Sequence, residues 1–425
     1  MTSSVEIEVC ASWQGLEAPR TVGLLCATTV RGRNVFSFAY DKDWLRAEYV
    51  LQLDPRLSLF EGPQYPPADL DSFGVFLDSS PDRWGRVLLN RREAARARQE
   101  SRKPRALREV DYLLGVFDPH RQGGLRYRLG TDQPFLDDDT EYASPPWTSL
   151  RALEEISRRL EESGVENDPS YSRWLGMLVA PGRSLGGARP KASVVDDKGN
   201  LWIAKFPSAS DTEDIGAWEG VVHTLAMRAG IVTAPARVER FGSPNHTFIT
   251  QRFDREKSGG RVHFVSAMTQ LEMKAGEAGA SYLDLAEILI QQGAQPTEDL
   301  EQLWRRVAFN VCVSNVDDHL RNHGFLLGPS GWRLAPAYDM NPVAHGDGLT
   351  LNISDSDNSQ HMDLVLEVAD YFRVKKARAQ QILRTVREAV AQWREVAAGL
   401  GISRDAQDRM ENAFRLTEEL SRGGR

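Results

Sequence analysis

An aspartate and an asparagine separated by four residues form the strongest chemical signal in the sequence. They are Asp317 and Asn322, in the segment Asn315-Val-Asp-Asp-His-Leu-Arg-Asn322. In the catalytic loop of kinases, an aspartate at this spacing orients the acceptor hydroxyl and the asparagine binds magnesium. Both groups must lie close to the γ-phosphate, and one short loop can present them together. Because the spacing is also common in ordinary loops, the prediction depends on the surrounding sequence.

A second carboxylate, Asp339, follows this loop across a predicted hairpin. Apolar runs that begin at Phe325 and Trp332 flank the turn residues 329–331. The hairpin would return Asp339 toward Asn322, and Mg²⁺ prefers oxygen ligands of these two kinds. Both are therefore candidate metal ligands. The alternative for Asp339 is a residue that caps a turn.

Upstream, a lysine lies within an apolar strand pattern, Trp202-Ile-Ala-Lys205-Phe. A buried ammonium group requires a partner, and Glu219 in the next predicted helix is the candidate. Kinases pair a strand lysine with a helix glutamate and place the lysine on the α- and β-phosphates. A strand-edge lysine that extends into water is the alternative.

A glycine-containing turn precedes this strand, in Ser184-Leu-Gly186-Gly187-Ala-Arg-Pro-Lys191. Its backbone N–H groups could cradle phosphates, although Pro190 removes one donor. It is not a Walker A loop, because no Gly-Lys-Ser/Thr follows. The turn, the strand lysine, the helix glutamate, the loop and Asp339 come in the order that a kinase requires, which is improbable by chance.

His319 and His323 are four residues apart, a spacing that would suit zinc on a helix. The residue after His319 is Leu320 and not the glutamate of His-Glu-x-x-His, and no third ligand is evident nearby. We instead expect His319 to act near the γ-phosphate or to brace the loop.

The composition sets limits on the class of protein. The 425 residues include 52 Lys+Arg and 60 Asp+Glu, a net charge of −8, which argues against a protein held on nucleic acid by phosphate neutralisation. Three cysteines without a Cys-x-x-Cys pair, no signal-peptide pattern and no long apolar run predict a cytoplasmic protein without a membrane segment. The basic segment 91–108 favours a solvated helix face over a phosphate-binding surface.

The pattern of elements predicts an α+β chain with three parts. Residues 1–140 are expected to form a β-rich subdomain with strands at 5–10, 21–30 and 35–40, followed by a helix that starts at Ser80. Residues 148–255 would form a small α+β lobe, in which a capping box at Ser210–Glu213 opens a helix that ends near Ala229. Residues 256–425 would form a mostly helical lobe, interrupted by the hairpin at 325–335.

These motifs resemble those of the HipA family of toxin kinases from bacterial type II toxin–antitoxin systems. The resemblance covers nearly the full length and implies a bilobal protein-kinase-like fold with an extra β-rich N-terminal subdomain. It also implies ATP- and Mg²⁺-dependent phosphorylation of serine or threonine on a protein. The implied roles are catalysis by Asp317 with His319 beside it, metal binding by Asn322 and Asp339, ATP binding by Lys205, Glu219, Gly186 and Gly187, a hinge at Gln251, Arg252 and Phe253, and autophosphorylation of Ser184.

The resemblance implies partners as well. They are a small HipB-like helix-turn-helix antitoxin, operator DNA contacted only through that antitoxin, and a protein substrate, for which an aminoacyl-tRNA synthetase is a candidate. Arg321 departs from the lysine that often precedes the asparagine in this family, so its contact geometry should differ. Two alternatives remain open: a small-molecule kinase of the aminoglycoside type, and a non-catalytic nucleotide-binding corepressor.

Overall fold

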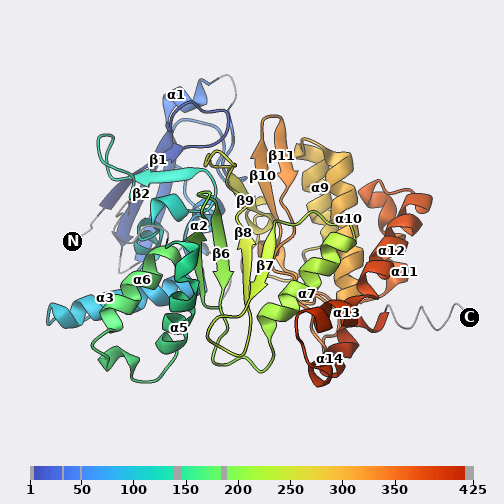
Figure 1. Cartoon of the computed structure of the whole chain (residues 1–425). Coiled ribbons are helices and arrows are strands. Elements are labelled where there is room, and N and C mark those ends of the chain that lie inside the picture. The colour runs from blue at the N-terminus through green and yellow to red at the C-terminus, as the bar shows by residue number, and fades with distance from the viewer. Residues whose placement is uncertain (1–3, 31–32, 48–49, 137–144, 183–188, 417–425) are drawn as a thin grey trace, which may run out of the picture. The chain divides into compact units, whose positions relative to one another are not determined.

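The structure, a computed structural model, describes residues 4–30, 33–47, 50–136, 145–182 and 189–416 (Figure 1). These residues form two compact units. The first unit contains residues 1–209 and 254–265, and the second contains residues 210–253 and 266–425. The chain therefore passes from one unit to the other at three points. The three-part division expected from the sequence remains a prediction.

A four-stranded antiparallel sheet begins the first unit. Its strands are β1 (Ser4–Ala11), β2 (Arg20–Val30), β3 (Arg33–Tyr40) and β4 (Leu125–Arg128), in the order β3-β2-β1-β4. Alternate residues such as Ile7 and Leu25, which are paired in register, are fully buried on one face of the sheet. The short helices α1 (Lys42–Leu45) and α2 (Gly74–Asp78) contribute Trp44 and Phe76 to the same core. The three strands predicted from the sequence are confirmed, and β4 was not predicted.

Helices make up most of the remainder of the first unit. They are α3 (Arg83–Gln99), α4 (Glu109–Leu114), η1 (Asp118–His120), η3 (Trp147–Ser149), α5 (Leu150–Leu160), η4 (Val165–Asn167) and α6 (Tyr171–Gly182). Helix α3 begins after Asp82, whose carboxylate accepts a hydrogen bond from the Gly85 N–H, and not at Ser80 as predicted. An antiparallel hairpin, β5 (Lys191–Val195) and β6 (Leu201–Lys205), follows.

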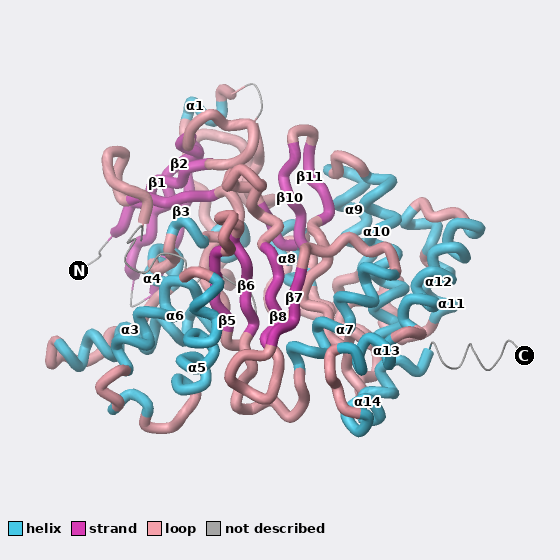
Figure 2. Tube along the Cα trace, in the orientation of Figure 1, coloured by secondary structure: helices cyan, strands magenta, loops and turns pink. Residues whose placement is uncertain are grey.

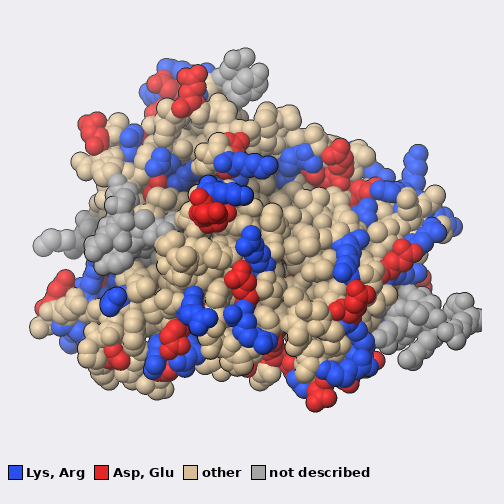
Figure 3. Space-filling model, in the orientation of Figure 1, with Lys and Arg blue, Asp and Glu red and all other residues tan. Residues whose placement is uncertain are grey.

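Several cations of the basic segment make contacts within the first unit. Arg102 lies 2.6 Å from Glu93, Arg105 lies 2.8 Å from Asp111, and Arg98 donates to the Glu166 carbonyl at 2.8 Å. All three arginines are exposed, but only Arg98 lies on α3, so the expected solvated helix face covers only part of the basic segment. On the face drawn in Figure 3, basic and acidic side chains are interspersed.

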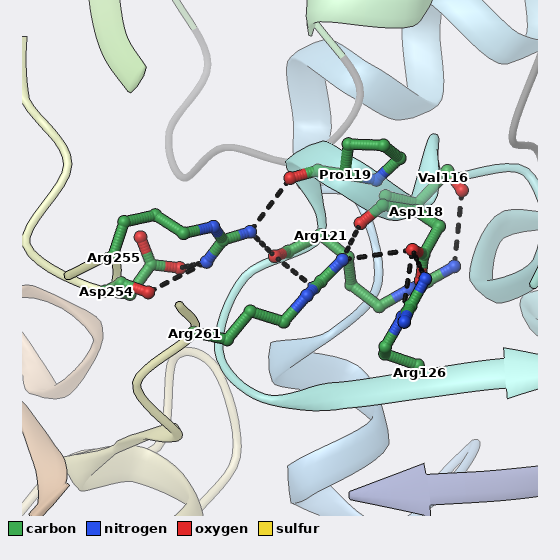
Figure 4. Close-up of polar contacts among 8 residues, drawn as sticks. All are labelled: Val116, Asp118, Pro119, Arg121, Arg126, Asp254, Arg255 and Arg261. Carbon is green, nitrogen blue, oxygen red and sulfur yellow. Dashed lines mark hydrogen bonds and ion pairs between the residues drawn. The ribbon is translucent and has the colours of Figure 1, made fainter. Parts of the chain in front are cut away.

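The segment 254–265 belongs to the first unit although it follows a strand of the second. Figure 4 shows the contacts of its Arg255 and Arg261 with residues 118–121. Arg255 donates to the carbonyls of Pro119 and Arg121, at 2.9 and 2.8 Å. Arg261 lies 3.0 Å from Asp118, which also accepts from Arg126 at 2.6 Å. These contacts attach the segment to the turn that precedes β4.

The second unit begins with helix α7 (Ile215–Arg228) and the antiparallel hairpin β7 (Ala236–Glu239) and β8 (Thr247–Gln251). The predicted capping box at Ser210–Glu213 is wrong. Asp214 caps the helix by accepting from the Ala217 N–H at 3.2 Å, and it also binds the ring of His246 at 2.6 Å. A side chain that is fixed by a second element is better placed to cap than the serine four residues earlier.

The remaining elements of the second unit are mainly helical (Figure 2). Strand β9 (Phe264–Ser266) spans the boundary of the units. It is followed by α8 (Ala267–Gln270), α9 (Tyr282–Gln292), α10 (Pro296–Val313), η5 (Leu320–Asn322), β10 (Gly324–Gly328), β11 (Gly331–Leu334), α11 (Met362–Glu367), η6 (Ala369–Phe372), α12 (Lys376–Val390), α13 (Trp393–Gly399), α14 (Arg404–Met410) and η7 (Glu411–Phe414). The predicted hairpin is confirmed, whereas residues 335–361 form a long loop where helix was expected. Within the described ranges, no helix combines the length and the apolarity needed to cross a bilayer.

Candidate active site

Helix α10 ends at Ser314, and this ending opens the loop that carries Asp317. Ser314 adopts a left-handed conformation with φ 48°, and its N–H donates to the carbonyl of Asn310. A left-handed residue reverses the chain at the end of a helix and is uncommon for residues other than glycine. The following residues leave the helix axis and form the loop 315–323, which ends in the short turn η5.

A buried carboxylate, Asp318, holds this loop from within. It accepts from the hydroxyl of Tyr282 at 2.5 Å, from Nδ2 of Asn310 at 2.8 Å and from Nε2 of His323 at 2.7 Å. Burial by itself would raise the pKa of Asp318, but the charge of His323 and the hydrogen bonds from His323 and Tyr282 hold the pKa below its ordinary value. Asp318 is therefore a charged hub that joins α9, α10 and the loop.

The two residues at the predicted catalytic spacing lie in different environments. The side chain of Asp317 is exposed, whereas Asn322 is only 7% exposed. Nδ2 of Asn322 donates to the backbone carbonyl of Asp317 at 3.1 Å. This bond holds the carboxamide of Asn322 against the backbone of Asp317.

Asp339 lies in a segment that is fastened to the same loop. Asn315 donates to Oδ1 of Asn310 at 3.2 Å, and its own Oδ1 accepts from the N–H of Asn341 at 3.1 Å. The hydroxyl of Tyr338 donates to the carbonyl of Arg321 at 2.8 Å. Asp339 itself has φ 58°, a conformation that aspartate tolerates better than most residues. The structure thus joins the two segments that carry Asp317, Asn322 and Asp339.

A buried arginine beside this site was missed from the sequence. Arg306 on α10 is 3% exposed and donates to the carbonyl of Ala335 at 2.6 Å. Burial lowers the pKa of Arg306 to about 10, although Asp318 opposes the shift. The available signal was the position of Arg306 directly before the apolar run Val307–Phe309, because a guanidinium buried beside such a run requires acceptors.

His319 and His323 do not form a helical pair. His319 has an extended backbone, with φ −104° and ψ 170°, and His323 is committed to Asp318. Among the described residues, Nδ1 of His319 is buried and has no hydrogen-bond partner. Across all the residues that the structure describes, no three His, Cys, Asp or Glu side chains are grouped closely enough to hold a metal ion by themselves.

Glu219 is buried in α7, at 4% exposure, on a helix that packs closely against its hairpin. A Cβ atom at Gly216 would lie 2.0 Å from the carbonyl oxygen of His246, and one at Gly220 would lie 2.3 Å from Val238. Only glycine allows this approach, which fixes the depth and the rotation of α7 around Glu219.

The predicted hinge residues follow β8. Gln251 ends the strand, and Arg252 is buried at 5% exposure. The ring of Phe253 packs against that of Tyr338, with the ring centroids 5.3 Å apart. Phe253 therefore contacts the segment that carries Asp339.

The remaining predicted residues belong to the first unit. Lys205 ends β6 and is paired in register with Lys191, whose ammonium lies 3.3 Å from Asp82. Ser184, Gly186 and Gly187 lie outside the described residues, so their predicted roles stay predictions.

Comparisons with known proteins show which family and which fold this chain resembles. The family model of the HipA-like C-terminal domain matches residues 183–393. A chain of the Shewanella oneidensis MR-1 toxin–antitoxin complex of HipA, HipB and operator DNA matches with a TM-score of 0.60 and 16% identity, over 97% of each chain. A match at this identity shows the fold, and it confirms the α+β fold of HipA type.

Two curated relatives match a smaller part of the chain. The "Putative kinase Y4mE" of Sinorhizobium fredii is 26% identical over 219 residues, which are 47% of this chain and 50% of that protein. A "Putative kinase" of Haemophilus influenzae is 26% identical over 200 residues, which are 41% of this chain and 58% of that protein. The chain thus spans about half the length of the curated relatives that it matches.

The fold and the family model together define the class as a HipA-like α+β protein. Residues 183–393 are a HipA-like C-terminal domain, and the chain as a whole has the fold of the matching HipA structure.

Proposed function

We propose that this protein is a HipA-like serine/threonine-protein kinase that transfers the γ-phosphoryl group of ATP to a protein, with Mg²⁺ as the metal. The observation that carries the proposal is the joining of the Asp317–Asn322 loop to the segment of Asp339 through Asn315 and Asn341. The names of the two curated relatives support kinase activity.

The chemistry assigned to the loop follows from its exposure and its supports. Asp317 is exposed and can accept the proton of a substrate hydroxyl while it orients that hydroxyl toward the γ-phosphate. The buried hydrogen bonds to Asp318 keep the loop in one conformation. Little reorganisation of the loop is therefore needed during phosphoryl transfer. His319 lies beside the reacting groups in this scheme.

The residues present fit a magnesium ion held jointly by protein and nucleotide. The carboxamide oxygen of Asn322 and the carboxylate of Asp339 are hard oxygen ligands, and Mg²⁺ in such sites takes one or two protein oxygens together with phosphate oxygens and water. When bound, the ion neutralises charge on the β- and γ-phosphates. Lys205, Glu219, Gly186, Gly187 and residues 251–253 are proposed to bind ATP.

The direct test is incubation of the purified protein with ATP and Mg²⁺, followed by mass spectrometry. We expect one phosphate on Ser184, and Asp317→Ala should abolish it. A phosphate brings a charge of about −1.5 to −2 into a turn proposed to hold ATP phosphates, so the modification should inactivate the enzyme by repulsion. A folded wild type that binds ATP but phosphorylates neither itself nor any other protein would favour the corepressor alternative.

We also propose that the protein acts as a toxin and is neutralised by a small helix-turn-helix antitoxin. The support is the matching complex from Shewanella oneidensis, which contains HipA, HipB and operator DNA. Expression of the wild type should slow growth more than expression of Asp317→Ala does, and co-expression of a small helix-turn-helix antitoxin should restore growth. Equal growth with the wild type and the variant would remove the toxin proposal.

A further inference from the structure

A short segment near the end of the described chain contacts several parts of the candidate site at once. These residues, Glu411 to Arg415, comprise η7 and the residue that follows it, and we call them the C-terminal brace. They lie beyond residue 393, where the match to the HipA-like C-terminal domain ends. All of their contacts described below are within the second unit.

On one side, the C-terminal brace packs against the helix that carries Glu219. The ring of Phe414 stacks on Trp393 with a centroid distance of 4.4 Å, and both rings lie 6.2 Å from that of Trp218. All three side chains are buried to 2% exposure or less. Because Trp218 adjoins Glu219 in α7, this aromatic cluster restricts the position of the glutamate.

On the other side, the C-terminal brace binds the start of the catalytic loop. Arg415 donates to the hydroxyl of Ser314 at 3.3 Å and to Oε1 of Gln360 at 3.1 Å, and Ser314 donates to the same oxygen at 2.9 Å. Ser314 is the left-handed residue that opens the loop three positions before Asp317. Asn412 donates to the carbonyl of Ala344 at 2.5 Å, in the chain that follows Asp339.

We propose that the C-terminal brace is a positioning element of the kinase site. It holds the helix of Glu219 and the loop of Asp317 in fixed positions relative to each other. The inference rests on the proposed function. Phe414 and Arg415 touch neither substrate nor reacting atoms in this scheme and act through Trp218 and Ser314. A left-handed serine is a strained conformation that persists only where its surroundings enforce it, and Arg415 is one of the groups that do so.

The two sides of the C-terminal brace should have separable kinetic effects. Phe414→Ala loosens the helix of Glu219, so we expect the ATP concentration for half-maximal self-phosphorylation to rise about tenfold. Arg415→Ala loosens the loop of Asp317, so we expect the rate at saturating ATP to fall about tenfold with that concentration unchanged. Phe414→Leu and Arg415→Lys should each recover part of the loss.

Matched controls separate positioning from a general loss of stability. Phe372→Ala removes an equally buried ring in η6, and Arg378→Ala removes an arginine that is paired with Glu301 at 2.7 Å. We expect Phe372→Ala to lower Tm as much as Phe414→Ala does, without the change in ATP dependence. The inference is overturned if the control variants reproduce the kinetic changes, or if both brace variants stay within about twofold of the wild type.

A second measurement does not require activity. Hydrogen exchange of the full-length chain should show faster exchange at 215–220 in Phe414→Ala and at 314–318 in Arg415→Ala, and unchanged exchange there in the controls. If the wild type is inactive but these changes occur, the proposed function fails while the C-terminal brace stands as a structural coupling. If the wild type is active and exchange at both segments is unchanged, the C-terminal brace is refuted and the proposed function is retained.

Discussion

Adjacent residues on the candidate loop, Asp317 and Asp318, illustrate two different uses of the same side chain. Asp317 is exposed, whereas Asp318 is 3% exposed and accepts three hydrogen bonds. Removing the hub leaves a hydroxyl, an amide and an imidazole without their buried acceptor. Asp318→Ala should therefore cost about 3 kcal/mol in the free energy of unfolding, whereas Asp317→Ala should cost less than about 0.5 kcal/mol.

Urea denaturation of both variants checks this contrast. A double-mutant cycle that combines Asp318→Ala with His323→Ala should give a coupling of about 1 kcal/mol or more, because the two side chains are in contact. Additive effects of the two substitutions would show that the pair is not energetically coupled. Phosphoryl transfer should be lost in Asp317→Ala in spite of its normal stability.

A second residue, His263, makes the stability of the first unit dependent on pH. Its ring stacks on Trp13 with centroids 4.7 Å apart, and complete burial lowers the pKa of His263 to about 3. The folded protein keeps this imidazole neutral, whereas the unfolded chain protonates it below about pH 6.5. Its contribution is therefore fully present above pH 6.5 and is lost as the pH falls toward 3, by at most about 1.4 kcal/mol per pH unit.

His263→Phe provides the test, because phenylalanine keeps the stacking on Trp13 but cannot titrate. We expect the free energy of unfolding of this variant, measured in urea between pH 4 and pH 7, to fall less steeply toward acid than that of the wild type. Parallel slopes for the two proteins would contradict the assignment.

At the scale of elements, helix α7 depends on an N-cap that the sequence pattern placed wrongly. Asp214 accepts from the N–H groups of Ala217 and His246 and from the His246 ring. Asp214→Ala should cost about 1–2 kcal/mol, and Ser210→Ala should cost less than about 0.5 kcal/mol. Thermal unfolding of the two variants compares the rival caps, and an equal loss in both would favour the sequence-based prediction.

Elements and motifs that depend on neighbouring residues could be predicted from the sequence. Features that depend on contacts between distant residues could not. Strands β1 to β3, the β5–β6 hairpin and the β10–β11 hairpin could be predicted from alternation and turn residues alone. The spacing of Asp317 and Asn322 could likewise be recognised. The cap at Asp214 could not, because it depends on His246, which lies on another element.

The same reasoning applies to the supports of the candidate site. Nothing in the local sequence of Asp318 shows that Asn310, on the preceding helix, and Tyr282, 36 residues away, converge on it. The helical period that the sequence suggests after Tyr282 does not hold over residues 335–361, which form a long loop. The structure holds it by contacts such as that of the Thr350 N–H with the Val316 carbonyl at 3.0 Å.

At the scale of the whole molecule, the first unit is assembled from two separate stretches of chain. Arg255 and Arg261 fasten the second stretch to residues 118–121, as Figure 4 shows. Hydrogen bonds from charged donors are worth about 1.5–3 kcal/mol each. The double variant Arg255→Ala/Arg261→Ala should therefore lose about 3 kcal/mol or more of stability in the first unit.

Hydrogen exchange resolved by segment measures that loss. Amides of β4 and of residues 118–124 should exchange faster in the double variant, while those of α10 and α12 in the second unit keep their protection. Lys257→Ala, an exposed position in the same segment, is the control and should leave all segments unchanged. A uniform change across both units would show that stability is shared over the whole chain.

The interleaving of the two units also has a consequence for synthesis on the ribosome. The sheet of the first unit is complete in sequence by residue 128, yet its attachment to residues 254–265 must wait until that stretch has left the exit tunnel. By then α7 and the β7–β8 hairpin, which belong to the other unit, have already been translated. The nascent chain therefore cannot finish one unit before it begins the next, and the usual order of N-terminal folding first does not hold for this protein.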